Sequence, residues 1–308
     1  MLSRNDGSVR FDVSVIGLGA MGTIMARAFL RQGKRVAVWN RSGDKADVLV
    51  AEGAHRCETA AAALEASPVA VLVLLDNDAV HAMLSMPGVE QALAQRTIVN
   101  YTTNSKEDSI ALQDLVHRAG GHFVKGVIVA YPRNVGHCES YCIHAGDRDA
   151  FERHRDLLQI LAGHALFLTW DDAHSLSTTL HAHLFAAMFT FYEAVSASSH
   201  LGMPAAEAAR LISDVSRFFI ADAIADAARR FDTGNFASDQ ARLDVHLSAF
   251  DYMAEALHKR GAEVPIFDVV CEVTRRARSM GYGSQDISAA VKAFAPEGAV
   301  QSMPPQAR

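Results

Sequence analysis

A glycine-rich turn near the start of this 308-residue chain has the residue types and spacing that most directly predict chemistry. Gly17, Gly19 and Gly22 follow the short apolar run 13–16 and precede a helix-forming segment. In such a turn the first glycine permits the tight bend, the second lets the backbone approach a pyrophosphate, and the third lets helix and strand pack closely. The pyrophosphate would lie at the helix N-terminus, where unpaired N–H groups favour negative charge. The predicted dinucleotide turn also includes Leu18, Ala20 and Met21.

The end of the next predicted strand, Arg35–Trp39, decides which dinucleotide fits. A carboxylate there would hold the ribose 2′-hydroxyl of NAD and repel a 2′-phosphate. The chain instead has Asn40, Arg41 and Ser42, with Lys45 one turn further on. A cation and neutral hydrogen-bonding groups suit a 2′-phosphate, so we predict NADPH as the cofactor. The alternative is that Arg41 is an ordinary surface arginine.

Three further loops follow predicted strands, where ligands bind in an open α/β sheet. In the loop 100–105, hydroxyl and amide groups can line the nicotinamide or the ribose, or cap the next helix. In the loop 75–78, we expect Asp78 to cap a helix rather than to act as a catalyst. In the loop 129–136, a proline and a glycine stiffen and turn the backbone. The cofactor contacts taken from these loops are Leu75, Asn100 and Thr102, and the substrate contacts are Tyr131 and Pro132.

The composition excludes several classes of protein. Half of the residues are hydrophobic, and the net charge is −6 with the basic residues dispersed. Nothing therefore indicates binding to nucleic acid or to an anionic membrane. No apolar run is long enough to span a bilayer, and the N-terminus lacks the apolar core of a signal peptide. Cys138 and Cys142 have no matching cluster of ligands, so we expect no metal site and a reduced, cytoplasmic protein.

Strand and helix patterns alternate over the first half of the chain, which is typical of a doubly wound α/β domain. The run 69–75 is continuously apolar, as expected of a parallel strand covered by helices on both faces. The predicted strands are Val13–Gly17, Arg35–Trp39, Val69–Leu75, Thr97–Tyr101, His122–Val129, Tyr141–Ala145 and Ala165–Leu168. The predicted helices are Met21–Arg31, Lys45–Glu52, Thr59–Ala66, Asp78–Leu84 and Ser105–Ala119.

After Asp172 the strand patterns vanish and helix patterns follow. Residues 174–200 contain no proline or glycine and would form one helix about 40 Å long. Because this helix carries few polar residues, we expect it to be buried on most sides, and a homodimer is the simplest source of that burial. The further helices predicted are Ala205–Val215, Phe218–Arg230, Gln240–Arg260 and Pro265–Met280.

These patterns predict two folded domains. Residues 12–172 would form an NADP-binding Rossmann domain. Residues 173–295 would form an all-helical dimerisation and substrate domain, including the linking helix 174–200. The terminal segments 1–11 and 296–308 are polar or proline-rich, and we predict that they are disordered.

The long helix carries candidate catalytic side chains. His174, Thr178, His181 and Phe185 fall on one face by helical spacing. His181 and His183 are two residues apart, so they point in different directions. A histidine on a buried helix is most often a hydrogen-bonded core residue, and spacing alone assigns it no chemistry.

Several motifs together resemble one family. They are G-L-G-A-M-G, V-W-N-R-S-G-D-K-A, V-A-V-L-V-L-L-D-N-D-A-V, V-N-Y-T-T-N-S, G-V-I-V-A-Y-P-R-N-V-G and the closing R-A-x-x-x-G-Y-G-S. The chain from Asp12 to Phe294 resembles the β-hydroxyacid dehydrogenase superfamily and, within it, the NADPH-dependent imine reductases and reductive aminases. The resemblance implies a nucleotide domain, a long linking helix and a helical domain. It also implies an intertwined homodimer with its active site at the interface, built from both chains.

One position on the long helix separates the activities within that superfamily. Hydroxyacid dehydrogenases of this kind have a lysine there, but this chain has no lysine between Trp170 and Arg210. Imine reductases commonly have an aspartate or a tyrosine, and here His181 aligns with the position if a one-residue adjustment is allowed. His183 is the competing alignment. A histidine can donate a proton at neutral pH.

We therefore predict an NADPH-dependent enzyme that reduces imines to amines, or carries out reductive amination, with His181 as the catalytic residue. Two rival functions remain: a 3-hydroxyacid dehydrogenase-like carbonyl or alcohol oxidoreductase, and a non-catalytic NADP-binding protein. The helical residues predicted to line the substrate pocket are Phe185, Met188, Phe189, Asp244 and His246. The last two, Asp244 and His246, are expected to reach the site from the second subunit.

Overall fold

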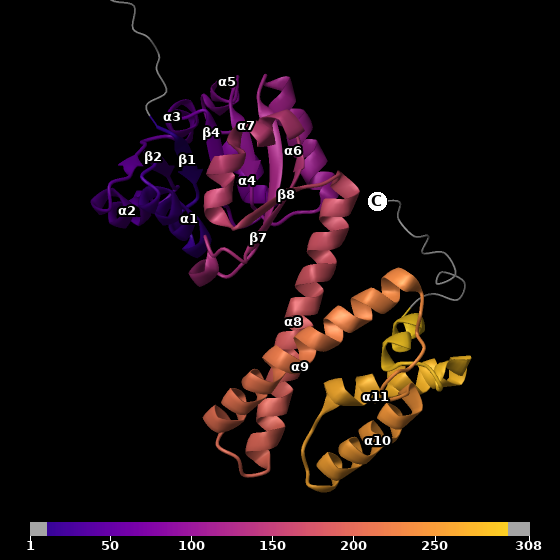
Figure 1. Cartoon of the computed structure of the whole chain (residues 1–308). Helices are drawn as coiled ribbons and strands as arrows, with labels where there is room; N and C mark the ends of the chain where they lie inside the picture. The colour runs from indigo at the N-terminus through magenta and orange to yellow at the C-terminus, as the bar shows by residue number, and fades with distance from the viewer. Residues whose placement is uncertain (1–10, 295–308) are drawn as a thin grey trace, which may run out of the picture. The chain divides into compact units, whose positions relative to one another are not determined.

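A computed structural model describes residues 11–294, which divide between His181 and Ala182 into two compact units (Figure 1). The predicted disorder of residues 1–10 and 296–308 lies outside the described residues. Phe11 was predicted to be disordered, and this prediction is wrong. Its N–H donates to the Ala66 carbonyl at 3.1 Å, and its ring stacks on His55. These contacts fix Phe11 to the first unit.

The first unit is built on one eight-stranded sheet with the order β3-β2-β1-β4-β5-β6-β7-β8. All neighbouring strands are parallel except β6 and β7. The order reverses at β1, which lies between β2 and β4, and this is the place where doubly wound folds bind ligands. The strands are β1 (Val13–Ile16), β2 (Val36–Trp39), β3 (His55–Arg56), β4 (Val69–Leu72), β5 (Thr97–Asn100), β6 (His122–Val129), β7 (Tyr141–Gly146) and β8 (His164–Phe167).

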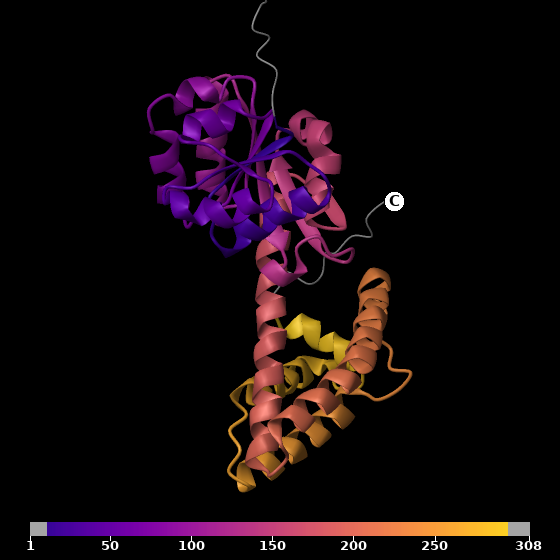
Figure 2. The ribbon, with the colours of Figure 1, turned by 90° about the vertical axis from the view of Figure 1, so that its left-hand side faces the viewer.

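Helices cover both faces of this sheet, and Figure 2 shows them on its two sides. One apolar cluster lies between the strands and α1, α2 and α7, and a second lies between the strands and α3 to α6. The continuously apolar strands predicted this arrangement. The helices are α1 (Ala20–Arg31), α2 (Asp47–Ala51), α3 (Ala60–Glu65), α4 (Asn77–Leu84), α5 (Val89–Ala92), α6 (Lys106–Arg118) and α7 (Arg148–Leu158), with 3₁₀ turns η1 (Gly43–Ala46), η2 (Pro132–Asn134) and η3 (Gln159–Leu161).

Side-chain caps fix where these helices begin. The Asp76 carboxylate accepts from the Ala79 N–H at 2.8 Å, so Asp76 caps α4 and Asp78, the predicted cap, lies in the first turn. Ser105 and Asp108 complete a capping box at α6. The long helix α8 (Trp170–His200) begins four residues before the predicted start at 174, because the Thr169 hydroxyl accepts from the Asp172 N–H.

The second unit is all-helical. It contains the later part of α8, followed by α9 (Ala205–Thr233), α10 (Leu243–Lys259), α11 (Pro265–Ala277), the π-helical turn η4 (Arg278–Tyr282) and the 3₁₀ turn η5 (Ile287–Ala293). The segments 205–215 and 218–230 were predicted as two helices but form the single helix α9, since no proline or glycine interrupts them. The Glu193 carboxylate of α8 accepts from the N–H groups of Ile266 and Phe267, which ties α8 to the start of α11.

A buried arginine closes the end of α9. The Arg230 side chain is 5% exposed and pairs with Asp226 and Asp239, each at 2.6 Å, and it also donates to the Ala237 carbonyl. These bonds fix the segment between α9 and α10. Among residues 11–294, no helix combines the length and apolarity needed to cross a membrane.

Candidate functional site

The glycine turn after β1 has the geometry that a dinucleotide requires. Gly17 has a φ of +98°, and a Cβ there would lie 2.2 Å from the Val73 carbonyl oxygen. A Cβ on Gly22 would lie 1.9 Å from the Gly17 carbonyl oxygen. By contrast, no atom lies within 4 Å of a Cβ built on Gly19, which is the residue that caps α1 without any side-chain hydrogen bond. Backbone atoms therefore crowd Gly17 and Gly22, whereas the space around Gly19 is open. This open space lies at a helix N-terminus that can accept an anion.

Asn40 joins this turn to the end of β2. Its Oδ1 accepts from the Leu18 N–H at 2.9 Å, and its Nδ2 donates to the Ser42 carbonyl at 2.9 Å. The amide of Asn40 therefore holds two loops in place. Arg41, Ser42 and Lys45 are exposed beside it, and the loop has no carboxylate at the end of β2 itself. An open cradle and adjacent exposed cations fit a dinucleotide that carries a 2′-phosphate.

The ends of β4 and β5 lie next to the glycine turn, at the carboxyl edge of the sheet. Leu75 is 88% exposed. Asn100 and Thr102 are buried: the Asn100 Oδ1 accepts from the Thr102 N–H at 3.0 Å, and the Thr102 Oγ1 accepts from the Leu74 N–H at 2.9 Å. Because these two buried side chains bond to the loop backbone, a ligand at this loop would meet backbone atoms and the exposed Leu75 side chain.

Lys125 is a residue of this edge that sequence reasoning missed. It lies on β6 in register with Asn100 of β5, it is 9% exposed, and its Nζ donates to the Thr102 carbonyl. Burial lowers the pKa of Lys125 to about 8. The Asn100 Nδ2 beside it has no partner among the described residues. A lysine inside the apolar run 122–129 was the available signal, because lysine is rarely buried.

A buried tyrosine and histidine brace the same loop from the other face of the sheet, and these were also missed. The Tyr101 hydroxyl lies 2.8 Å from the Nε2 of His144, whose Nδ1 lies 3.1 Å from the Leu166 carbonyl. Since a carbonyl only accepts, Nδ1 carries the proton and Nε2 accepts from Tyr101. Burial lowers the pKa of His144 to about 4. A Cβ on Gly126 would lie 2.4 Å from the tyrosine ring, so this glycine makes room for it.

The remaining residues predicted for the first unit lie on η2 and α8. Tyr131 is 44% exposed and precedes Pro132, which starts η2; the Arg133 guanidinium lies 5.4 Å from the tyrosine ring centroid. On α8 the Nδ1 of His181 lies 2.7 Å from the Ser177 carbonyl, and His183 is exposed.

The other predicted substrate residues belong to the second unit. Phe185 and Phe189 are 48% and 59% exposed, and Met188 is partly buried between them on α8. At the start of α10, the Asp244 carboxylate pairs with Arg278 at 3.2 Å, and the His246 Nδ1 lies 3.1 Å from the Arg242 carbonyl.

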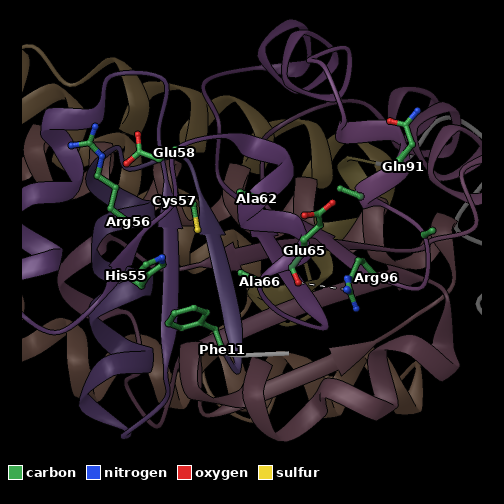
Figure 3. A pocket seen from close by; sticks show the side chains of 12 residues that line it. Phe11, His55, Arg56, Cys57, Glu58, Ala62, Glu65, Ala66, Gln91 and Arg96 are labelled. Atoms are coloured by element: carbon green, nitrogen blue, oxygen red, sulfur yellow. Dashed lines mark hydrogen bonds between the residues drawn. The ribbon is translucent and has the colours of Figure 1, made fainter. Parts of the chain in front are cut away.

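A separate cavity of about 780 Å³ lies beside β3 and α3 (Figure 3). Its lining includes Phe11, His55, Arg56, Glu65 and Arg96 and none of the residues predicted for the site. It is therefore distinct from the glycine turn. Within residues 11–294, no group of three or more His, Cys, Asp or Glu side chains is arranged to hold a metal ion.

The sheet order and the glycine turn define a dinucleotide-binding domain. The family model for the NAD binding domain of 6-phosphogluconate dehydrogenase matches residues 12–170. The model for the C-terminal domain of NADPH-dependent reductive aminase-like proteins matches residues 174–296.

Solved structures agree with both halves. A putative oxidoreductase from Pseudomonas putida KT2440 is 61% identical, with a TM-score of 0.91, over 95% of this chain and 100% of that one. An imine reductase from Pseudomonas sp. is 30% identical, with a TM-score of 0.84, over 93% and 100%. A reductive aminase from Aspergillus terreus, in complex with NADPH and ethyl levulinate, is 28% identical, with a TM-score of 0.82, over 92% and 99%.

The chain belongs to the imine reductase and reductive aminase family. It is an oxidoreductase, and NADPH is its cofactor. The predicted family, the fold of a Rossmann domain followed by a helical domain, and the predicted cofactor are therefore confirmed.

Proposed function

We propose that this enzyme reduces the C=N bond of imines to amines. Two observations support this proposal: imine reductases and a reductive aminase match more than nine-tenths of the chain, and α8 carries His181 but no lysine. An alcohol or carbonyl substrate of the hydroxyacid type would need another group to do the work of that lysine.

The proposed cofactor contacts follow the geometry of the first unit. The open cradle at Gly19 would hold the pyrophosphate against the N–H groups of Ala20, Met21 and Gly22. Arg41, Ser42 and Lys45 would bind the 2′-phosphate, and Asn40 would hold their loop against Leu18. Leu75 would cover the nucleotide, while Asn100 and Thr102 would act through the backbone that they fix.

His181 is the proposed proton donor. Hydride, which bound NADPH supplies, adds to the imine carbon while the nitrogen gains a proton, so one amine forms. The Ser177 carbonyl accepts from the Nδ1–H of His181 and orients the ring, which assigns proton exchange to Nε2. Tyr131, Pro132, Phe185, Met188 and Phe189 would line an otherwise apolar pocket, and aromatic faces favour a cationic iminium.

We also propose that two copies form a homodimer. In a single chain, Phe218, Phe219 and Phe189 are 78%, 65% and 59% exposed on α8 and α9, and a partner surface would bury these large apolar side chains. A partner subunit covering these helices would bring Asp244 and His246 of that copy toward the active site. Light scattering should give twice the mass of the chain, and a monomer would contradict this proposal.

The activity is tested by following NADPH absorbance with 2-methyl-1-pyrroline and, separately, with a small keto acid. We expect consumption with the imine. Consumption with the keto acid alone would contradict imine reduction and favour a carbonyl reductase. NADPH binding without turnover on a broad panel of imines would favour a non-catalytic role.

Replacing His181 with alanine should lower kcat about 100-fold, the usual effect of losing a general acid. The affinity for NADPH should change less than about twofold, because the cofactor cradle is built from other residues. Steady-state kinetics and fluorescence titration measure the two effects. His183→Ala is the matched control, and it should leave kcat near the wild-type value. A larger loss in His183→Ala than in His181→Ala would reverse the assignment.

A further inference from the structure

Arg56 brings a third cation to the loop that follows β2. It lies on the short strand β3, in register with Val38 of β2. A Cβ built on Gly43, in the turn η1, would lie 2.4 Å from one guanidinium nitrogen of Arg56 and 2.8 Å from its central carbon. The guanidinium therefore lies directly against the backbone of the loop that carries Arg41 and Lys45.

Most N–H donors of this guanidinium are available to a ligand. Among the described residues, none forms a hydrogen bond with it, and its ion pair with Asp47 is long, at 3.6 Å from Nη1 to Oδ1. The Arg56 side chain is 40% exposed and that of Asp47 is 69% exposed, so solvent screens this pair. The other charged residues of the loop are Arg41, Asp44 and Lys45.

We propose that Arg56 is a specificity residue for the 2′-phosphate of NADPH, acting together with Arg41 of the loop that follows β2. The inference rests on the proposed 2′-phosphate site at Arg41, Ser42 and Lys45. An arginine fork can donate two parallel hydrogen bonds to a phosphate, which a lysine cannot match.

The absence of a side chain at Gly43 allows this position of Arg56. Any side chain at this position would meet the guanidinium and displace it from the loop. Arg56 is also one of the residues that line the cavity beside β3 (Figure 3), so its side chain borders both the cavity and the loop.

The test measures the binding of 2′,5′-ADP and of 5′-AMP by calorimetry, since these two ligands differ by the 2′-phosphate alone. Arg56→Ala should weaken 2′,5′-ADP binding about tenfold and change 5′-AMP binding less than twofold. Arg56→Lys, which keeps the charge, should recover part of the loss. Arg96→Ala, at the opposite side of the same cavity in Figure 3, is the matched control and should alter neither affinity.

Two results would overturn the inference. Unchanged 2′,5′-ADP affinity in Arg56→Ala would remove the residue from recognition. Equal losses for both ligands would show that Arg56 only supports the loop. Arg41→Ala in the same assay tests the proposed site separately, because a selective loss there with none in Arg56→Ala rejects Arg56 and keeps the site. Thermal unfolding of each variant checks that it is folded.

Discussion

Replacing Gly22 with alanine is expected to abolish NADPH binding and to destabilise the first unit by about 3 kcal/mol, at the upper end of overpacking effects. The added Cβ would lie 1.9 Å from the Gly17 carbonyl oxygen and 3.0 Å from its carbon. Both are backbone atoms of a turn that Val73 closes from the other side, so neither can move alone. Helix α1 would have to shift away from β1, and the cradle for the pyrophosphate would open. Urea unfolding and fluorescence titration with NADPH measure the two losses.

Gly19→Ala separates the binding surface from the fold. Nothing lies within 4 Å of a Cβ at this position, so the variant should unfold at the wild-type urea concentration. Its methyl group would nevertheless occupy the space proposed for the pyrophosphate, and NADPH affinity should fall at least about tenfold. Gly33→Ala is the control at the far end of α1: its Cβ also meets no atom, but the φ of +70° strains an alanine by about 1 kcal/mol. This variant should therefore unfold at a lower urea concentration and leave the affinity unchanged. Wild-type affinity in Gly19→Ala would contradict the proposed cradle.

The fold could be predicted where a local pattern determines the structure. The glycine spacing and the apolar runs located β1, β2 and β4. The change from strand patterns to helix patterns after Asp172 located α8. Two elements were missed for different reasons. Strand β3 has only two residues and exists because β2 offers it an edge. Helix α7 is highly charged, and only its buried face, which includes Phe151, joins the core.

The candidate site could be predicted less completely, because its support comes from residues that are distant in sequence. The amide of Asn40, a predicted cofactor contact, bridges Leu18 and Ser42. Arg56 reaches Gly43 only because β3 pairs with β2. Lys125 reaches Thr102 only because β6 lies beside β5. These pairings cannot be predicted from residue spacing alone, because they depend on which strands are neighbours in the sheet.

Lys125 should give the protein a rise in stability at alkaline pH that Lys125→Met lacks. Burial lowers the pKa of this lysine from 10.5 to about 8 in the folded state. Between these two values the unfolded chain binds more protons than the folded one, so stability increases with pH. A shift of this size corresponds to about 3 kcal/mol. Below pH 8 the lysine is charged in both states, and the full penalty of burying its charge remains.

Comparing wild type with Lys125→Met separates the effect of Lys125 on stability from that of the other buried titratable groups. Burial raises the pKa of Cys57 to about 11 and that of Cys142 to about 12, and these thiols affect both proteins equally. Urea unfolding between pH 7 and pH 10.5 should therefore show wild type gaining about 3 kcal/mol relative to the methionine variant. At pH 7 the variant should be equal or more stable, because losing the bond to the Thr102 carbonyl offsets part of the gain from removing a buried charge. Lys34→Met, at a partly exposed lysine, should follow the wild-type profile, and parallel profiles for Lys125→Met and wild type would contradict the burial argument.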